Sequence, residues 1–390
     1  MANTIAIIGG GMAGLGCAIA LQKAKKPFVL FEASDRFGGR VHSYKRGGLT
    51  VDRGFQVLLP HYPTCQQLLN YKALDLCHYP SGAQIISDHG FKWFGKPFSY
   101  PTAYKKGKKL NATLTDYIQM GLDTLGGLQP PTGTSSPTSG HLKNCYSAAF
   151  NNEFLTPFFR GVFLDPNCST GVQQFKFYLN CFFRAGAAVP KNGMQAIPNQ
   201  LANQLPTAQL HLNTTVDSIN QNKLTINGDT QTFEHIVIAT DGHRAHQLLH
   251  QPTPKNAWHH VHNTILTTSQ PTQLGPLTLI AKKSPVSHIN IPTLLADKLA
   301  PQGTHYMNVS HFNSSNPETI ESEVHQLTNE HHWRVAWTDT ISHALPSIQM
   351  TPKITNDHIS ICGDFTSFAS IEGALKSGYN LGQRIAKSRQ

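Results

Sequence analysis

The sequence predicts an α/β fold organised around a parallel sheet that binds a dinucleotide. Residues 4–8 form a short, β-branched apolar run, which is typical of a buried parallel strand. The next six residues, 9–14, fit the pattern G-x-G-x-x-G at the point where this strand passes into a helix. A chain of 390 residues also exceeds the usual size of one hydrophobic core, which predicts two domains.

The residues after the glycines extend this prediction. We expect a helix over residues 13–26, ended by Pro27, and a second buried strand over residues 28–31. The glycines allow a tight turn and close approach to a pyrophosphate, whose charge meets the N–H groups at the helix N-terminus. Glu32 ends the second strand, where its carboxylate can accept hydrogen bonds from ribose hydroxyls.

Composition and charge narrow the function classes. The chain has 39% hydrophobic residues, and neither a membrane-spanning stretch nor a signal peptide is expected. Seven scattered cysteines predict reduced thiols and a cytoplasmic location. The net charge of +10 and the lysine cluster at residues 105–109 leave peripheral contact with an anionic membrane open. No nucleic-acid motif accompanies them, so no nucleic-acid partner is predicted.

A second glycine-rich segment follows the dinucleotide pattern. Gly38 and Gly39 give the backbone freedom, and Arg40 offers a planar guanidinium suited to phosphate oxygens. The strand expected over residues 49–58 contains Gly54, and glycine within a strand often marks the approach of a ligand.

Residues 32–40, E-A-S-D-R-F-G-G-R, placed after such a unit resemble the superfamily of flavin-containing amine oxidases, protoporphyrinogen oxidases and phytoene desaturases. This resemblance implies FAD rather than NAD as the cofactor. Residues 158–166 and the segment V-P-K-N-G-M-Q-A-I at 189–197 look most like the short phytoene-desaturase-like oxidoreductases. Asn192 stands where that group has a glycine, a tolerable exchange because Asn also adopts positive φ.

The end of the chain is similar to the C-terminal flavin motif of the same superfamily. A strand at residues 359–364 ends in Gly363 and Asp364, which the resemblance places at the pyrophosphate–ribityl region. The terminal helix, opening at Ser370 and Ile371, would then begin near the O2 atom of the flavin ring. Ser370 is a suitable N-cap, and a helix N-terminus stabilises negative charge on reduced flavin.

The centre of the chain shows weaker matches. We expect a helix over residues 197–205, hairpin strands over residues 210–219 and 223–226, and a buried strand over residues 235–241. The resemblance implies that the backbone of Val216 contacts the adenine.

The resemblance implies a Rossmann-type FAD-binding domain, glutathione-reductase-like, with an inserted α+β substrate domain. The FAD-binding domain would comprise residues 1–59, 189–243 and 351–390. The substrate domain would comprise residues 60–188 and 244–350. Within it, residues 126–140 read as a surface loop, inert or a lid, residues 265–280 as strands, and residues 318–333 as a helix.

The predicted cofactor-binding residues are glycines, residues that would contact FAD through their backbone, or residues with polar side chains at the ends of strands and helices. They are Gly9, Gly11, Ala13, Gly14, Glu32, Ala33, Gly39, Arg40, Gly54, Phe55, Gln56, Val216, Gly363, Asp364, Ser370 and Ile371. The FAD is expected to be non-covalent, because Cys362, the cysteine beside the terminal motif, lies inside a strand.

The expected activity is removal of two electrons from an apolar organic substrate by FAD, in the manner of a desaturase. Amine oxidation, and FAD used structurally or for a non-redox isomerisation, are the alternatives. No catalytic residue and no metal site is predicted; the histidines at residues 259–262 and 331–332 are expected to be exposed or hydrogen-bonded. Lys282 and Lys283 are weak candidates for a lysine near the flavin ring. Candidates around the ring and substrate are Asp52, Arg53, Gln56, Phe55, Phe365, Phe368, Trp333 and Trp337.

Small residues recur every fourth position in two helices far apart in sequence. The terminal helix carries Ala374, Gly378, Gly382 and Ala386, and the first helix carries Gly16, Ala20 and Ala24. Such ridges let helices approach closely, so we predict that both helices belong to one FAD-binding unit.

Overall fold

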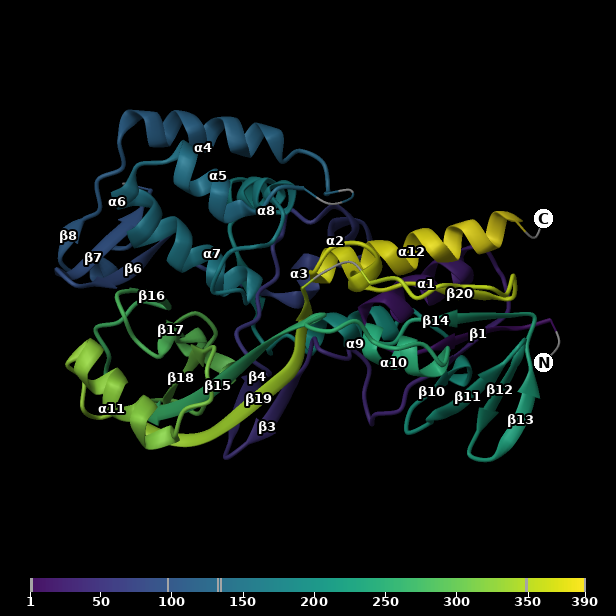
Figure 1. The fold of residues 1–390 in the computed structure, drawn as a ribbon. Helices are drawn as coiled ribbons and strands as arrows, with labels where there is room; N and C mark the ends of the chain where they lie inside the picture. The colour runs from purple at the N-terminus through teal and green to yellow at the C-terminus, as the bar shows by residue number, and fades with distance from the viewer. Residues whose placement is uncertain (1–2, 97, 132, 134, 348–349, 389–390) are drawn as a thin grey trace.

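The computed structural model describes residues 3–96, 98–131, 133, 135–347 and 350–388. The outermost residues of the predicted FAD-binding segments, 1–2 and 389–390, and residues 132 and 134 of the predicted surface loop therefore lie outside the described part. Figure 1 shows two sheets side by side, with the first and last segments of the chain together in one half of the molecule.

The first sheet is parallel and has the strand order β10-β2-β1-β14-β20. Its strands are β1 (Ile5–Ile8), β2 (Phe28–Phe31), β10 (Leu210–His211), β14 (His235–Ile238) and β20 (Ile359–Ile361). All four residues of β1 are buried, because both faces of the sheet are covered. Ile5 and Ile7 point into one hydrophobic cluster, whereas Ala6 and Ile8 point into another.

Two helices from opposite ends of the sequence cover one face of this sheet. Helix α1 (Met12–Lys23) and helix α12 (Ile371–Ser388) lie side by side (Figure 1). A Cβ atom at Gly378 would overlap the carbonyl oxygen of Ala13, and one at Gly16 would come within 2.6 Å of the carbonyl oxygen of Leu375. The two small-residue ridges therefore pack directly against each other.

A smaller antiparallel sheet covers the other face. It consists of β11 (Val216–Asn220), β12 (Lys223–Ile226) and β13 (Asp229–Thr232), and α10 (Gly242–Leu248) lies beside it. The buried side chains of Val216, Leu224 and Ile226 pack against Ala6 and Ile8. The result is a three-layer unit of helices, parallel sheet and antiparallel sheet.

The second large sheet has the strand order β19-β15-β18-β17-β16-β6-β7-β8. Its strands are β6 (Gly82–Ser87), β7 (Gly90–Gly95), β8 (Lys108–Lys109), β15 (Trp258–Thr268), β16 (Leu277–Ala281), β17 (Val286–Asn290), β18 (His305–His311) and β19 (Arg334–Pro346). The parallel pair β16–β6 joins strands from two separate parts of the chain.

Most helices of this half gather over one side of the second sheet, and α11 lies on the other (Figure 1). The helices on the first side are α4 (Leu114–Gly126), α5 (Thr138–Cys145), α6 (Ala148–Phe150), α7 (Thr156–Phe163) and α8 (Val172–Ala185). Helix α11 comprises Pro317–Thr328. A π-helical turn, Asn151–Leu155, precedes α7.

Shorter elements connect the two halves. These are β3 (Ser43–Arg46), β4 (Leu49–Asp52), α2 (Pro63–Leu68), α3 (Tyr71–Leu74), β5 (Leu76–His78), β9 (Ala188–Pro190) and α9 (Ala196–Ala202). Short 3₁₀ turns occur at Thr102–Tyr104, Thr207–Gln209, Pro292–Leu294, Asp297–Leu299 and Asp364–Thr366.

Several predicted boundaries differ from the structure for local reasons. The strand predicted over residues 210–219 is split, because Asn213 adopts φ 52° and sends β10 and β11 into different sheets. The helix predicted over residues 318–333 ends early, because Asn329 takes a left-handed cap. The strand predicted over residues 49–58 stops at Asp52, and Gly54 has φ 80°.

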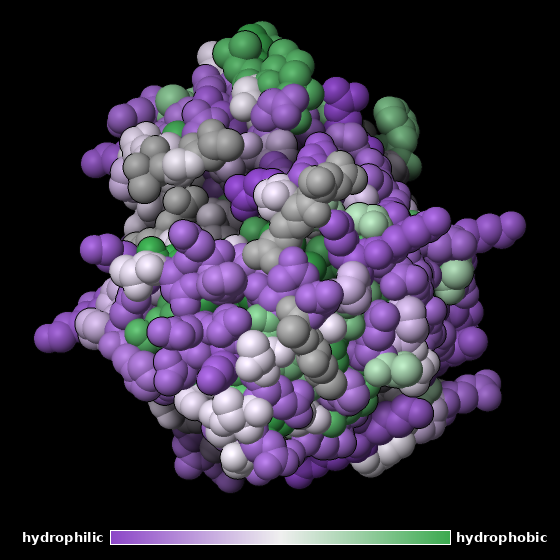
Figure 2. Space-filling model, turned by 90° about the vertical axis from the view of Figure 1, so that its right-hand side faces the viewer, coloured by the Kyte–Doolittle hydropathy of each residue, from purple (hydrophilic) through white to green (hydrophobic). Residues whose placement is uncertain are grey.

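Within the described residues, no helix combines the length and apolar character needed to cross a membrane. All seven cysteines are free thiols, and burial raises the pKa of Cys17, Cys65 and Cys362. Figure 2 shows a polar surface interrupted by an apolar patch at the top of the molecule, where Figure 1 places α4.

Candidate functional site

A cavity of about 800 Å³ extends from the carboxyl ends of β1 and β14 toward the helices over the second sheet. One part, which we call the glycine end, is lined by Gly9, Gly11, Glu32, Gly39 and Gly363. The other part, the aromatic end, is lined by Phe154, Phe158, Phe159, Phe182 and Phe183. The cavity therefore lies at the edge where both sheets meet, a common position for ligands in α/β proteins.

The three glycines of G-x-G-x-x-G have different roles. Gly9 has φ 106°, and a Cβ there would come within 2.8 Å of the carbonyl oxygen of Ala239. A Cβ at Gly14 would overlap the carbonyl oxygen of Gly9, so these two glycines permit close packing. A Cβ at Gly11 would meet no atom within 4 Å, and Gly11 lines the cavity. Gly11 thus keeps space open in front of α1.

The N-terminus of α1 faces this space. Its N-cap, Gly11, makes no side-chain cap hydrogen bond, and the first turn contains no acidic residue. Met12 and Ala13 of that turn line the cavity. Because the first N–H groups of a helix lack partners within it, this end favours an anionic ligand group.

Glu32 places a carboxylate at the end of β2, on the cavity wall. One oxygen accepts a hydrogen bond from Gly10 N at 2.7 Å. The other accepts from Ser34 N at 2.9 Å and from Ser34 Oγ at 2.7 Å. An ionised carboxylate has about four acceptor positions, so these bonds fix its orientation and leave capacity for a ligand hydroxyl.

Arg40 and Asp364 connect the two sequence ends across the site. The guanidinium donates to the Asp364 carboxylate at 2.6 Å and to the carbonyl oxygen of Ala344 at 3.0 Å. Burial acts to lower the pKa of Arg40, but the Asp364 carboxylate and, after it, the Asp241 carboxylate together raise that pKa. Gln56 donates to the carbonyl oxygen of Arg40 at 2.8 Å, so the arginine backbone is held as well.

Helix α12 also begins at the cavity. Ser370 Oγ accepts a hydrogen bond from Gly373 N at 2.8 Å, which confirms the predicted N-cap. Ser370 and Ile371 line the cavity together with Gly363 and Asp364.

All the predicted cofactor-binding residues except Gly14 line this one cavity. Gly14 instead packs against Gly9 inside the strand–helix unit. Two neighbours that the sequence did not single out are Asp241 and Arg244. Asp241 caps α10, and Arg244 donates to the carbonyl oxygen of Val216 at 2.8 Å.

Of the three polar residues expected beside Gly54, Arg53 and Gln56 line the cavity, but Asp52 does not. Asp52 is buried and accepts hydrogen bonds from Ser43 Oγ at 2.5 Å and Met194 N at 2.8 Å. Burial raises the pKa of this carboxyl to about 6, against the lowering effect of those two bonds.

Most of the aromatic candidates are core residues. Phe55 lines the cavity, whereas Phe365 and Phe368 are buried in hydrophobic clusters behind it. Trp333 is fully buried under β15–β18, and Trp337 donates to Tyr44 Oη at 2.8 Å. Their indole N–H groups have protein partners, and neither tryptophan is among the residues that line the cavity.

The lysine candidates also lie elsewhere. Lys282 and Lys283 follow β16 and are absent from the cavity wall, where Lys96 is the lysine among the described residues. Both lysines come after Ala281, the last residue of β16, whereas Leu277 and Leu279 within that strand line the cavity.

The aromatic end was not predicted. Its phenylalanines come from the π-helical turn, α7 and α8, and Phe154, Phe158 and Val162 recur at helical spacing. That periodicity is the signal available in the sequence. His288 on β17 also lines the cavity, and no sequence pattern distinguishes it from the other histidines.

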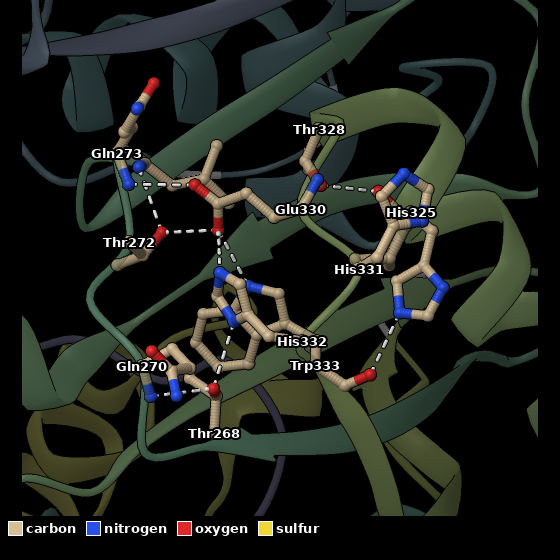
Figure 3. A network of polar contacts seen from close by, with 12 residues as sticks. Thr268, Gln270, Thr272, Gln273, His325, Thr328, Glu330, His331, His332 and Trp333 are labelled. Atoms are coloured by element: carbon tan, nitrogen blue, oxygen red, sulfur yellow. Dashed lines mark hydrogen bonds and ion pairs between the residues drawn. The ribbon is translucent and has the colours of Figure 1, made fainter.

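The histidine pair at residues 331–332 belongs to a structural network rather than to the cavity (Figure 3). His332 Nδ1 lies 3.0 Å from Thr268 Oγ1 and its Nε2 lies 3.6 Å from Glu330, which also accepts from Trp333 Nε1. Within the described residues, no group of three or more His, Cys, Asp or Glu side chains has a geometry that could hold a metal ion.

Comparisons with known proteins identify relatives by sequence. A family profile described as flavin containing amine oxidoreductase matches residues 12–273. The 1-hydroxycarotenoid 3,4-desaturase of Flavobacterium sp. (strain P99-3) is 36% identical over 83 residues, 19% of this chain and 17% of that protein. Polyamine oxidase 5 of Oryza sativa subsp. japonica is 41% identical over 112 residues, 27% of this chain and 21% of that protein. The chain thus matches only about a fifth of the length of these relatives.

The fold recurs in solved structures. An oxidoreductase from Methanosarcina mazei superposes with a TM-score of 0.73 at 16% identity, covering 97% of this chain and 99% of that one. At this identity the likeness shows the fold: an α/β Rossmann-type domain with a second, sheet-containing domain.

Proposed function

Because this chain belongs to the family of flavin containing amine oxidoreductases, we propose that it removes two electrons from an apolar organic molecule. The family match identifies FAD as the cofactor. The observation that carries the proposal is one continuous cavity that joins the glycine end to the aromatic end. A cofactor at the first and a substrate at the second would meet in it.

Two observations support the fit of FAD to these residues. Gly11 and the uncapped N-terminus of α1 leave an open cradle for a pyrophosphate, which a side chain at position 11 would fill. Gln56 lines the same cavity, and its Oε1 is buried without a hydrogen-bond partner among the described residues. A buried unpaired polar atom is costly, so a ligand group is the expected partner.

We propose a division of the binding work along the cavity. Glu32 would hold the ribose, and the start of α1 would hold the pyrophosphate. The segment Gly54–Gln56 and the start of α12 at Ser370 would hold the flavin ring. The remaining predicted residues on the cavity wall would complete the contacts.

We also propose that segments 1–59, 189–243 and 351–390 form the FAD-binding domain, and segments 60–188 and 244–350 the substrate domain. The strand pairing supports this division, because β1, β2, β10, β14 and β20 share one sheet and β6–β8 share the other with β15–β19.

When bound, FAD supplies the electron acceptor for the reaction. This chain's own residues position the substrate and exclude water, and the apolar lining of the aromatic end suits that task. No acid–base pair is required of the protein for such chemistry, and the carboxylates among the described lining residues, Glu32, Asp241 and Asp364, all belong to the glycine end.

The charge of the aromatic end favours a neutral substrate. Lys96 is a cation on its wall, and no carboxylate stands there among the described lining residues. A polyamine cation would lack a counter-charge, so a desaturase-like reaction is the first candidate. Amine oxidation is the second, supported by the similarity to polyamine oxidase 5.

We further propose that this protein makes peripheral contact with an anionic membrane through α4. Leu114, Ile118, Leu122, Leu125 and Leu128 are more than half exposed along α4 and just after it. Tyr117 and Phe183 are exposed and also line the cavity, so this apolar surface adjoins the aromatic end. The lysines of β8 and the preceding turn lie on the same half of the molecule and suit anionic lipid.

The test begins with the absorption spectrum of the purified protein reconstituted with FAD. Anaerobic mixing with an isoprenoid polyene is expected to bleach the visible flavin band, and mixing with putrescine or spermidine is expected to leave it unchanged. Bleaching by the amines alone would favour amine oxidation. Failure to bind any flavin would refute the proposed function.

A further inference from the structure

His288 is a buried polar residue on the wall of an otherwise apolar region. It lies on β17, is 1% exposed and lines the cavity. The ring centroid of Phe55 is 5.1 Å from its own, and Gly161 of α7 packs directly against its Nδ1 side. These contacts fix the imidazole plane between α7 and the segment proposed to hold the flavin ring.

The two ring nitrogens of His288 are not equivalent. Nδ1 lies 3.4 Å from Ser287 Oγ. Nε2 is buried and has no hydrogen-bond partner among the described residues. A buried polar atom without a partner is costly, so a ligand atom is the partner we expect for Nε2.

His288 lies among polar side chains on the sheet. Its neighbour on β18 is Ser310, which also lines the cavity and donates to Asn263 Oδ1 at 3.0 Å. Asn263 Nδ2, beside Gly54, is likewise buried without a partner among the described residues. On the other side, Tyr79 lines the cavity and donates to Asn290 Oδ1 at 2.7 Å. Polar side chains thus gather at one place on the apolar wall.

Burial and a neighbouring cation keep His288 neutral. Burial, and after it the Arg160 guanidinium on α7, lower the pKa of His288 to about 3. Arg160 itself is anchored to the carbonyl oxygen of Ile280 at 2.5 Å. The groups facing the ring from β18 and from the loop before α2 are Ser310 and Phe55, which carry no charge. A cationic ligand group would meet repulsion from Arg160, and the carboxylates among the described lining residues all lie at the glycine end.

We propose that His288 binds a hydroxyl group of the substrate through Nε2, so that the substrate is an apolar alcohol rather than a plain hydrocarbon. A hydroxyl both donates and accepts, so it complements Nε2 in either neutral tautomer. Ser310 and Tyr79 offer further hydroxyl oxygens on the same wall. This inference rests on the proposed function, because it assigns the aromatic end to the substrate.

The test compares geraniol with 2,6-dimethyl-2,6-octadiene, the hydrocarbon that lacks the hydroxyl, as probes of the FAD-loaded protein. Dissociation constants are measured by calorimetry near neutral pH for wild type, His288→Phe and His288→Gln. We compare the ratio of the hydrocarbon dissociation constant to the alcohol dissociation constant between variants, because the different hydration of the two probes cancels in this comparison. In His288→Phe the ratio should fall about fivefold, which corresponds to the loss of one hydrogen bond. His288→Gln, which retains a polar end, should keep part of the preference.

His311→Phe is the matched control, because His311 is an equally buried histidine of the same sheet that is not on the cavity wall. Its ratio should equal that of wild type. An unchanged ratio in His288→Phe, or no binding of geraniol to a flavin-loaded wild type, overturns the inference while leaving the proposed function intact. A wild type whose spectrum shows no flavin overturns both.

Discussion

The guanidinium of Arg40 and the carboxylate of Asp364 form a hydrogen-bonded ion pair of 2.6 Å between residues 324 positions apart. Asp364 is 3% exposed, and Arg40 also holds the carbonyl oxygen of Ala344. One pair thus ties the segment after β2 to the segment after β20, on the wall of the glycine end.

Arg40→Met should lower the free energy of unfolding by about 1–3 kcal/mol, because it leaves the buried Asp364 carboxylate without its partner. Chemical denaturation of the FAD-free protein measures this. Asp364→Asn in the Arg40→Met background should recover part of the loss. Arg36→Met is the control, since Arg36 pairs with the 74% exposed Asp35 and should change stability by only about 0–1 kcal/mol. Equal effects of the two arginine changes would contradict the role given to Arg40.

Gly378→Ala should destabilise the protein by about 1–3 kcal/mol, and Gly378→Leu by more, because the added atoms overlap the backbone of α1 at Ala13. Alanine is intrinsically the better helix former, so the loss would come from the helix contact alone. Gly121→Ala on α4 is the matched control, since a Cβ there meets no atom within 4 Å. It should be neutral or stabilising by up to about 1 kcal/mol, as thermal unfolding can show. A neutral Gly378→Ala would rule out the close contact of α1 and α12.

Gly11→Val should weaken FAD binding by about 10- to 100-fold while leaving the unfolding of the FAD-free protein nearly unchanged. The backbone at Gly11 is extended, with φ −70° and ψ −178°, and the new side chain would project only into the cavity. Fluorescence titration with FAD measures the first effect. Gly14→Ala is the contrasting variant, because its Cβ would strike Gly9 and reduce stability. Undiminished FAD affinity in Gly11→Val would place the pyrophosphate elsewhere.

Asp52→Asn should stabilise the protein above pH 6 and have progressively less effect toward about pH 4. Burial raises the pKa of Asp52 to about 6 in the folded state, above its ordinary value of 3.8. The folded state therefore binds a proton that the unfolded state has released, and wild-type stability falls as the pH rises between these values. The gain of the asparagine variant should reach up to about 3 kcal/mol at neutral pH, since it keeps the acceptor for Ser43 and Met194. A gain independent of pH would contradict this account.

Replacing Ile118 and Leu122 of α4 by Asp should reduce binding to vesicles of phosphatidylglycerol and phosphatidylcholine by at least about tenfold. Both side chains are more than half exposed on the apolar patch. Co-sedimentation measures the effect, and higher salt should weaken the wild type by screening its lysines. Ile354→Asp is the control, because Ile354 is an exposed apolar residue (38%) in the segment before β20. Equal losses in both variants would show general electrostatic repulsion instead of docking by α4.

The glycine end was predictable because its parts are local in sequence. Gly9, Gly11 and Glu32 occur at spacings set by one strand–helix–strand unit, and Asp364 follows strand β20 in a recognisable Gly-Asp pair. The aromatic end was not, because residues such as Phe158 and His288 meet only through packing of α7 against a sheet assembled from distant segments. Trp333 is an error of the opposite kind, because the sequence suggested a place in the substrate site and the structure places it in the core. Its indole N–H donates to Glu330, a contact that the sequence pattern did not predict.

The strand order of the first sheet has a consequence for how the chain acquires its fold. Strand β1 lies between β2 and β14, and β14 lies between β1 and β20, so the sheet cannot be completed until residues 359–361 have been synthesised. Helix α1 likewise cannot make its contacts with α12 until residues 371–388 have been synthesised. Contacts of such sequence separation slow folding, since a long loop must close before they form. A ribosome-bound chain that stops before β20 should therefore expose α1 and depend on chaperones, and the final thirty residues should trigger folding of the whole FAD-binding unit.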